Sequence, residues 1–93
     1  MKSAYELAME RLAKEGPIHH LTDDQKAAIA EIDDRYRAKI AEKEVFLGGK
    51  LAEAKMSGNY PEAAQIQEQL TRETARLRDE CEAEKAKVRE ASA

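Results

Sequence analysis

The sequence has few of the residues that build disulfides, strands and membrane spans. Its 93 positions include one cysteine, two prolines, four glycines and no tryptophan. A single cysteine excludes an internal disulfide. Five isoleucines, two valines and three threonines leave little material for β-strands. No apolar run approaches the roughly 20 residues that a transmembrane helix needs, and the first residues lack the apolar stretch of a secretion signal. We therefore expect a cytoplasmic protein without a β-sheet or a membrane segment.

Helix-forming residues, by contrast, are abundant. Ala, Glu, Lys, Leu and Arg supply 54 of the 93 residues, a composition typical of coiled coils and long helices. Charged residues make up 38% of the chain, yet the net charge is only -3 because both signs are interleaved. Such interleaving is typical of solvated helix faces. The composition predicts an all-α protein with a single helical domain over residues 1–93, too small for an ordinary enzyme core.

Glycine, proline and capping residues divide the chain into three helices. Gly16 and Pro17 end the first one, because proline cannot continue the backbone hydrogen bonds of a helix. Thr22 and Gln25 have the spacing of a capping box, and Pro61 suits the first turn of a helix that follows a turn at Gly58. The predicted elements are a short N-terminal helix, a linker, two long helices and a frayed tail, at about 3–15, 16–21, 22–57, 61–90 and 91–93.

Each long helix carries one stripe of core-forming residues, which we call the core seam. On the first helix the seam contains Ile29, Ile32, Tyr36, Ile40, Lys43, Leu47, Leu51 and Ala54. On the second it contains Ala63, Ile66, Leu70, Thr74, Leu77, Cys81, Lys85 and Val88. Antiparallel helices pair residues whose numbers have a constant sum, and every facing pair here adds to 117. The seam therefore predicts a long antiparallel, coiled-coil-like hairpin in which the two lysines extend their charged ends toward water.

A second stripe of mostly small residues runs along the opposite side of the first long helix. It contains Ala27, Ala30, Asp34, Ala38, Ala41, Val45, Gly48, Ala52 and Met56. One interpretation is that these alanines are present simply because alanine favours helix formation. The alternative is that the N-terminal helix or a second protomer packs on this stripe. A two-helix hairpin has a thin core, which favours such packing. We expect the N-terminal helix to fold against the open end of the hairpin or against a neighbour.

The long helices carry two further features, a pair of glycines and a group of basic residues. Gly48 and Gly49 cost about 2 kcal/mol relative to alanine inside a helix, so a break is the alternative to the continuous helix, with or without a kink, that we expect. A group of basic residues in the same third of the hairpin offers weak nucleic-acid binding as an alternative function. Acidic residues surround this group, which favours an ordinary mixed surface. The basic residues are Arg35, Arg37, Lys39, Arg72, Arg76 and Arg78.

Residues capable of catalysis or metal binding do not form a recognisable site. His19 and His20 are followed by acids at 23–24, but no third group has the spacing of a metal ligand. Cys81 faces Tyr36 in the seam, so we expect a small buried side chain rather than a reactive thiol. Acids often precede bases by four residues, as Asp33 precedes Arg37, which supports the helix. We expect no metal, no cofactor and no enzymatic activity.

The residues around the turn resemble a known family. An aromatic residue after the turn is followed by two alanines and two aliphatic residues, at Tyr60, Ala63, Ala64, Ile66 and Leu70. This pattern is similar to the UVR motif, the helical hairpin of the UvrB and UvrC excision-repair proteins, over about residues 51–70. Gln67-Glu68 replaces the Arg-Asp pair of the family, and Pro61 replaces an acid. The resemblance implies association through the apolar face around the turn.

These observations favour a non-catalytic structural or interaction protein that associates through helix-on-helix packing as a homodimer. One alternative is a small adaptor that binds a larger protein through the UVR-like hairpin tip, and the second is the weak nucleic-acid binder. The predicted interaction surface combines the small-residue stripe with apolar neighbours and the tip. It contains Ala38, Ala41, Val45, Phe46, Ala52, Met56, Tyr60 and Ile66.

Overall fold

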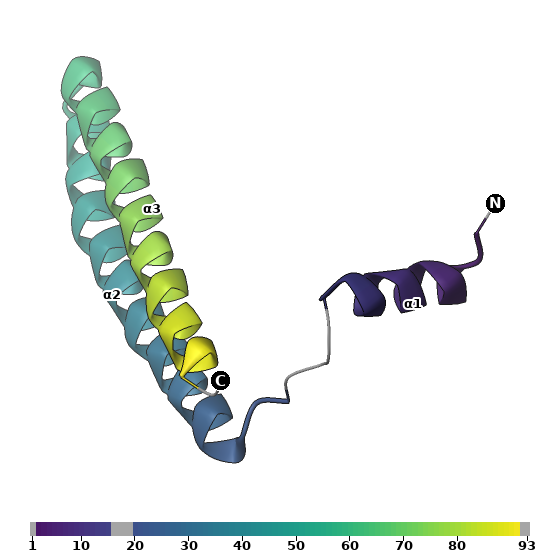
Figure 1. Cartoon of the computed structure of the whole chain (residues 1–93). Coiled ribbons are helices and arrows are strands. Elements are labelled where there is room, and N and C mark those ends of the chain that lie inside the picture. Colours follow the sequence, from purple (N-terminus) through teal and green to yellow (C-terminus); the bar gives the residue numbers. More distant parts are fainter. Residues whose placement is uncertain (1, 16–19, 92–93) are drawn as a thin grey trace.

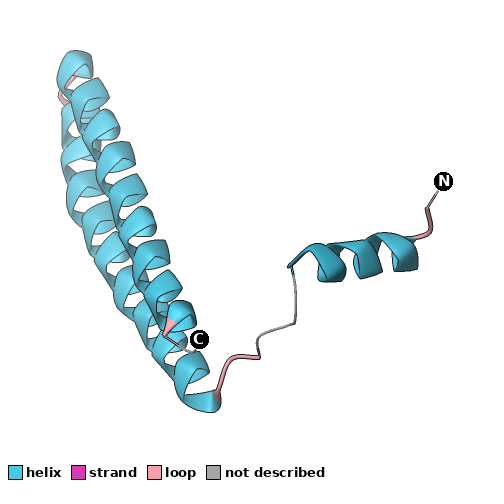
Figure 2. Ribbon diagram, in the orientation of Figure 1, coloured by secondary structure: helices cyan, strands magenta, loops and turns pink. Residues whose placement is uncertain are grey.

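The chain folds into three helices, two of which form a long hairpin. The computed structural model describes residues 2–15 and 20–91, and the regular structure within these residues is helical (Figure 2). The helices are α1 (Ala4–Glu15), α2 (Asp23–Met56) and α3 (Tyr60–Glu90). α2 and α3 lie side by side and run in opposite directions (Figure 1). The predicted all-α class and the antiparallel hairpin are confirmed, and the helix boundaries agree with the predicted ones to within one residue.

The first turn of α2 is held by a complete capping box. The backbone N–H of Gln25 donates to the Thr22 hydroxyl over 3.1 Å, and the backbone N–H of Thr22 donates to the Gln25 side-chain oxygen over 2.8 Å. These two bonds satisfy donors that the start of a helix otherwise leaves free. The Gln25 side-chain amide also donates to the carbonyl of Val88 over 3.1 Å. The residue that closes the cap therefore also joins the start of α2 to the end of α3.

The turn between the long helices depends on a left-handed glycine. Gly58 has a φ of +76°, which residues with a Cβ rarely adopt. Its N–H donates to the carbonyl of Lys55 over 3.1 Å, and the N–H of Asn59 donates to the carbonyl of Ala54 over 2.9 Å. This pair of bonds is a Schellman motif, which ends α2 and reverses the chain.

α3 begins one residue before the predicted start at Pro61. The Asn59 side-chain oxygen accepts a hydrogen bond from the backbone N–H of Glu62 over 3.3 Å, so Asn59 is the N-cap. Tyr60 then takes the first helical position and Pro61 the second. Proline is tolerated there because an N–H in the first turn has no partner within the helix.

α2 continues as a helix through Gly48 and Gly49. A methyl group built on either glycine would meet no atom within 4 Å, so the structure shows no close approach that requires glycine. Leu47 before the pair and Leu51 after it pack in the same apolar cluster. The prediction of a continuous helix is confirmed, because the seam keeps its spacing on both sides of the glycines.

The predicted core seam is the core of the hairpin. All sixteen of its residues are buried or half-buried. Twelve of them form two apolar clusters: an open-end cluster of Ile32, Tyr36, Ile40, Leu77, Cys81 and Val88, and a tip cluster of Leu47, Leu51, Ala54, Ala63, Ile66 and Leu70. The clusters group Ile40 with Leu77 and Leu47 with Leu70, in agreement with the predicted register. Lys43 and Thr74 lie between the clusters.

α1 stands apart from the hairpin. Its first turn is capped by Ser3, whose hydroxyl accepts a hydrogen bond from the N–H of Glu6 over 3.1 Å. Within the described residues α1 contacts neither α2 nor α3 (Figure 1), so the prediction that it folds against the open end of the hairpin is wrong for this structure. The predicted helix stop at Gly16-Pro17, most of the linker and the last two residues of the tail lie outside the described residues.

Candidate functional site

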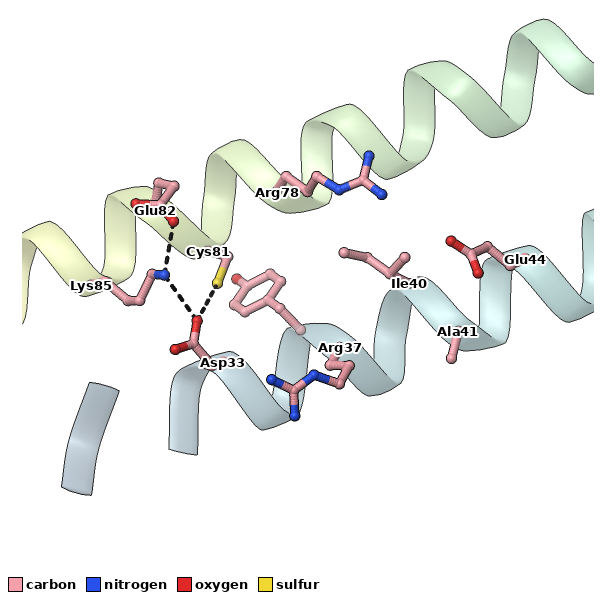
Figure 3. Close-up of a pocket in the computed structure, with 10 residues that line it drawn as sticks. Asp33, Arg37, Ile40, Ala41, Glu44, Arg78, Cys81, Glu82 and Lys85 are labelled. Atoms are coloured by element: carbon pink, nitrogen blue, oxygen red, sulfur yellow. Dashed lines mark hydrogen bonds and ion pairs between the residues drawn. The ribbon is translucent and has the colours of Figure 1, made fainter. Parts of the chain in front are cut away.

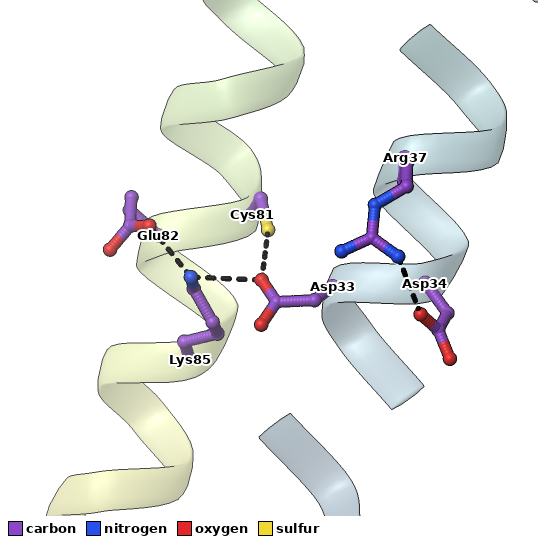
Figure 4. Close-up of polar contacts among 6 residues, drawn as sticks. All are labelled: Asp33, Asp34, Arg37, Cys81, Glu82 and Lys85. Atoms are coloured by element: carbon purple, nitrogen blue, oxygen red, sulfur yellow. Dashed lines mark hydrogen bonds and ion pairs between the residues drawn. The ribbon is translucent and has the colours of Figure 1, made fainter. Parts of the chain in front are cut away.

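The most developed polar contact of the hairpin joins α2 to α3 near the open end. The Lys85 ammonium lies 2.9 Å from a carboxylate oxygen of Asp33 and 2.8 Å from one of Glu82. The Cys81 thiol donates to the same Asp33 oxygen over 3.6 Å. Figure 4 shows Asp33 reaching from α2 toward Lys85 and Cys81 on α3, while Glu82 contacts Lys85 from the same helix. We call these four residues the Asp33 cluster.

The Asp33 cluster corrects two sequence-based expectations. The Lys85 side chain is only 13% exposed, so its ammonium does not reach out to water as predicted but is held between two carboxylates. Asp33 turns toward α3 rather than toward Arg37, which instead binds Asp34 over 3.0 Å (Figure 4). Helical spacing does not predict this contact, although Asp33 directly follows a seam residue and therefore lies at the edge of the interface.

The ionisation of the cluster suits a structural contact. The hydrogen bond from Lys85 lowers the pKa of Asp33. Hydrogen bonds to Glu82 and Asp33 raise the pKa of Lys85, so that its ammonium stays charged. Burial, and then the adjacent Asp33 carboxylate, raise the pKa of Cys81. Because thiolates are the reactive form of cysteine, Cys81 lies in surroundings that favour the unreactive thiol, as expected from its place in the seam.

A shallow groove of about 600 Å³ opens beside this cluster, between α2 and α3. Ile40 and Ala41 contribute apolar surface, while Arg37 and Arg78 bring positive charge and Glu44 adds a carboxylate (Figure 3). Tyr36 also lines the groove, and the Glu84 carboxylate raises the pKa of its phenol. Charges of both signs alternate around the groove, so it offers no concentrated field for an anion or a cation.

A second polar contact separates the two apolar clusters. The Lys43 ammonium lies 3.4 Å from one carboxylate oxygen of Glu73, and the other oxygen of Glu73 is buried without a hydrogen-bond partner in the described part of the chain. The buried Thr74 hydroxyl donates to the carbonyl of Leu70 in its own helix over 2.9 Å. Thr74 therefore satisfies its hydroxyl without contributing a polar contact across the seam.

The predicted basic group is interleaved with acids. Arg35 lies 3.2 Å from Glu84 across the hairpin, and Arg76 lies 3.7 Å from Glu80 on α3. With the Arg37–Asp34 pair, half of the six basic residues named for nucleic-acid binding contact a carboxylate. Among the residues that the structure describes, no three His, Cys, Asp or Glu side chains are placed to hold a metal ion. No helix of the described chain is long and apolar enough to cross a membrane.

The side of α2 that faces away from α3 carries mostly small and apolar side chains. We call it the outer face; it contains the predicted stripe of Ala27, Ala30, Asp34, Ala38, Ala41, Val45, Gly48, Ala52 and Met56. Its members are exposed except for Gly48, which is half-buried. The side of α3 that faces away from α2 carries charged residues such as Arg72 and Asp79 between exposed alanines such as Ala75. α2 is thus apolar both on the side that packs against α3 and on its outer face, while α3 is apolar only on the side that packs against α2.

Large apolar side chains stand on and beside this face. Val45 is 77% exposed and Phe46 is 61% exposed, and together with Ala41 they line a shallow hollow. The Lys50 ammonium lies 4.5 Å from the centre of the Phe46 ring, a cation–π contact. Within the described chain, no other helix covers these side chains.

The hairpin tip contains both an exposed and a buried member of the predicted surface. Tyr60 is 68% exposed and Met56 is 89% exposed. Ile66 is buried in the tip cluster between the helices. The expectation that Ile66 belongs to an interaction surface is therefore wrong, because the same side chain is a member of the core seam. The other seven predicted surface residues are exposed.

Comparisons with protein-family models, with curated proteins and with solved structures give no match to this chain.

Proposed function

We propose that this chain is a non-catalytic interaction protein that associates with itself as a homodimer through the outer face of α2. The observation that carries this proposal is the exposure of Val45 and Phe46 on and beside a face of small residues, with no other part of the described chain over them. Contiguous apolar surface of this kind on a small protein is characteristic of an association site. The polar outer side of α3 offers no comparable surface.

The small side chains of the face support helix-on-helix packing. Alanine and glycine let the axes of two helices approach closely, and a neighbouring valine or methionine fills the space between them. Ala38, Ala41 and Ala52 would provide the close approach, while Val45 and Met56 would provide apolar area. α2 would then pack against α3 on one side and against the second protomer on its outer face.

A pair of matched substitutions tests the homodimer. Ala41→Glu places a charge at the middle of the outer face, and Ala75→Glu places the same charge on the exposed outer side of α3. Sedimentation velocity from low to high micromolar concentration should show a dimer for the wild type and for Ala75→Glu, but a monomer for Ala41→Glu. A wild-type protein that stays monomeric at high micromolar concentration would contradict the proposal.

The exposed tip favours an adaptor as the second candidate function. Tyr60 and Met56 present an aromatic and a flexible apolar side chain on the two sides of the turn, in the region that resembles the UVR motif. An adaptor role predicts that Tyr60→Ala removes the binding of a purified partner while the helix content measured by circular dichroism stays unchanged. Ala41→Glu should leave that binding intact, which separates the two candidate functions.

A further inference from the structure

Phe46 is the one phenylalanine of the chain, and it lies on the surface of α2. The hollow beside its ring has a volume of about 390 Å³ and is also lined by Val45, Ala41 and Glu42. Exposed aromatic side chains beside a hollow are typical of the anchor positions of protein–protein interfaces. Phe46 is therefore the position on α2 from which an interface is most readily built.

Phe46 also lies at the centre of a symmetrical pattern of charges on its side of α2. Successive members of the pattern are three or four residues apart, so they share one side of the helix. Each charge has an opposite charge equally far along the chain beyond Phe46, at four residues for Glu42 and Lys50 and at seven for Lys39 and Glu53. All five residues are exposed, and we call them the Phe46 stripe.

The charges of the Phe46 stripe have no ionic partner within the described part of the chain. Seven ion pairs join other residues there, and none includes a member of the stripe. The Lys39 ammonium lies 4.7 Å from the centre of the Tyr36 ring, and the Lys50 ammonium lies 4.5 Å from that of Phe46. The two lysines thus contact aromatic rings rather than carboxylates, and all four charges are available to another molecule.

A second copy of the chain complements these charges when the two α2 helices run in opposite directions. With the two Phe46 side chains next to each other, every residue before Phe46 lies level with the residue equally far after it in the other copy. Glu42 then faces Lys50 at about 6 Å along the axis from Phe46, and Lys39 faces Glu53 at about 10 Å. A parallel pair would instead place each charge beside its own copy, where like charges repel.

The position of the stripe agrees with packing through the outer face. Val45 belongs to the outer face, and its neighbour Phe46 lies along one edge of that face. A two-fold symmetric interface uses the same patch of both subunits, so two antiparallel helices that pack through one face bring the same edge together. Packing through the outer face therefore brings the two Phe46 stripes into contact, and two aromatic rings meet at their centre.

We propose that two copies of the chain associate antiparallel through α2, with the two-fold axis at Phe46. Ion pairs between Glu42 and Lys50, and between Lys39 and Glu53, each form twice across this axis. This inference rests on the proposed homodimer and specifies its direction and its register. The aromatic rings supply apolar contact, while the charges select the antiparallel direction.

An exchange of charges at one pair tests the direction. In sedimentation velocity at low ionic strength, Glu42→Lys should raise the dissociation constant of the dimer at least about tenfold, because lysines then face each other. Glu42→Lys with Lys50→Glu should return the constant to within about threefold of the wild type, since opposite charges face each other again. Glu42→Lys with Arg72→Glu is the control. It has the same net charge as the rescued variant, but Arg72 lies on the outer side of α3, so dimerisation should stay weakened.

Failure of this arrangement can be distinguished from failure of the homodimer itself. A wild-type protein that stays monomeric at high micromolar concentration would contradict both proposals. A wild-type dimer that Ala41→Glu separates but Glu42→Lys leaves unchanged would overturn the antiparallel arrangement alone. Absence of rescue by Lys50→Glu, or equal rescue by Arg72→Glu, would overturn it as well.

Disulfide formation locates the axis. In a Cys81→Ala background, a mixture of the Lys39→Cys and Glu53→Cys proteins should form a disulfide between the two proteins at least about tenfold faster than either protein forms one with itself. Positions 39 and 53 face each other across the axis, whereas the two copies of position 39 lie about 21 Å apart along it. Equal rates, no disulfide in the mixture, or faster disulfides between identical molecules would each contradict this register.

Discussion

At the scale of single residues, the Asp33 cluster joins the helices near the open end by electrostatic contact. Asp33 accepts hydrogen bonds from both Lys85 and Cys81, which lie one turn apart on α3. A shift of the helices by one residue would separate these partners, whereas apolar side chains accept such shifts more easily. Polar contacts inside helical interfaces fix register in this way. In this chain we regard the Asp33 cluster as a device that sets the register of the hairpin.

The lowered pKa of Asp33 predicts an acid-dependent loss of stability. The carboxyl keeps its charge to a lower pH in the folded hairpin than in the unfolded chain, where its pKa lies near the ordinary 3.8. Its contribution to the free energy of unfolding is therefore present above about pH 4 and disappears as the pH falls through the folded pKa. Asp33→Asn should flatten this decline in urea midpoints measured from neutral pH to about pH 2. Asp79→Asn is the exposed control, and an equally steep decline in Asp33→Asn would contradict the prediction.

At the scale of the elements, each glycine acts through the backbone conformation of its position. Gly49 lies inside α2, where a methyl group would meet no atom within 4 Å. Gly49→Ala should therefore raise the free energy of unfolding by about 1 kcal/mol. Gly58→Ala should lower it by about 1–2 kcal/mol, because Gly58 alone of the three described glycines has a positive φ. Chemical denaturation checks both values, and a stabilising Gly58→Ala would show that the turn does not need a left-handed residue.

The elements also show how far sequence reasoning reaches. The core seam could be predicted because helical spacing and a constant residue sum follow from geometry alone, so Leu47 and Leu70 were paired correctly. The role of Ile66 was wrong because one apolar residue fitted both the seam and the family pattern. The partners of Asp33 could not be predicted because a charged side chain at the edge of an interface can bind a partner on its own helix or on the next one. Helical spacing does not decide between these partners.

At the scale of the whole molecule, the hairpin has two apolar clusters separated by Lys43, Glu73 and Thr74. The tip cluster lies next to the turn, so its contacts close a short loop. The open-end cluster closes a much longer loop, which carries a larger entropy cost. The two halves of the hairpin therefore differ in the entropy cost of forming their contacts. Because of this difference, they need not unfold together.

A core substitution can separate the two halves. Tyr36 is buried in the open-end cluster, and Tyr36→Ala should lower the stability of that half by about 3 kcal/mol. Native-state hydrogen exchange should then show faster exchange at about residues 25–40 and 77–90, while amides around the tip cluster keep their protection. Leu47→Ala in the tip cluster is the matched control, with the opposite expected pattern. Uniform acceleration along both helices in the two variants would show that the hairpin opens as one unit.

The short side chains of the outer face also determine how a partner helix would be recognised. From residue 27 to residue 41 four of the five members are alanine, so an apposed helix could reach an interaxial distance of about 8 Å. At that separation Cα–H groups of one backbone approach carbonyl oxygens of the other. Backbone shape then governs selectivity, and even an apolar enlargement such as Ala38→Leu would push the axes apart.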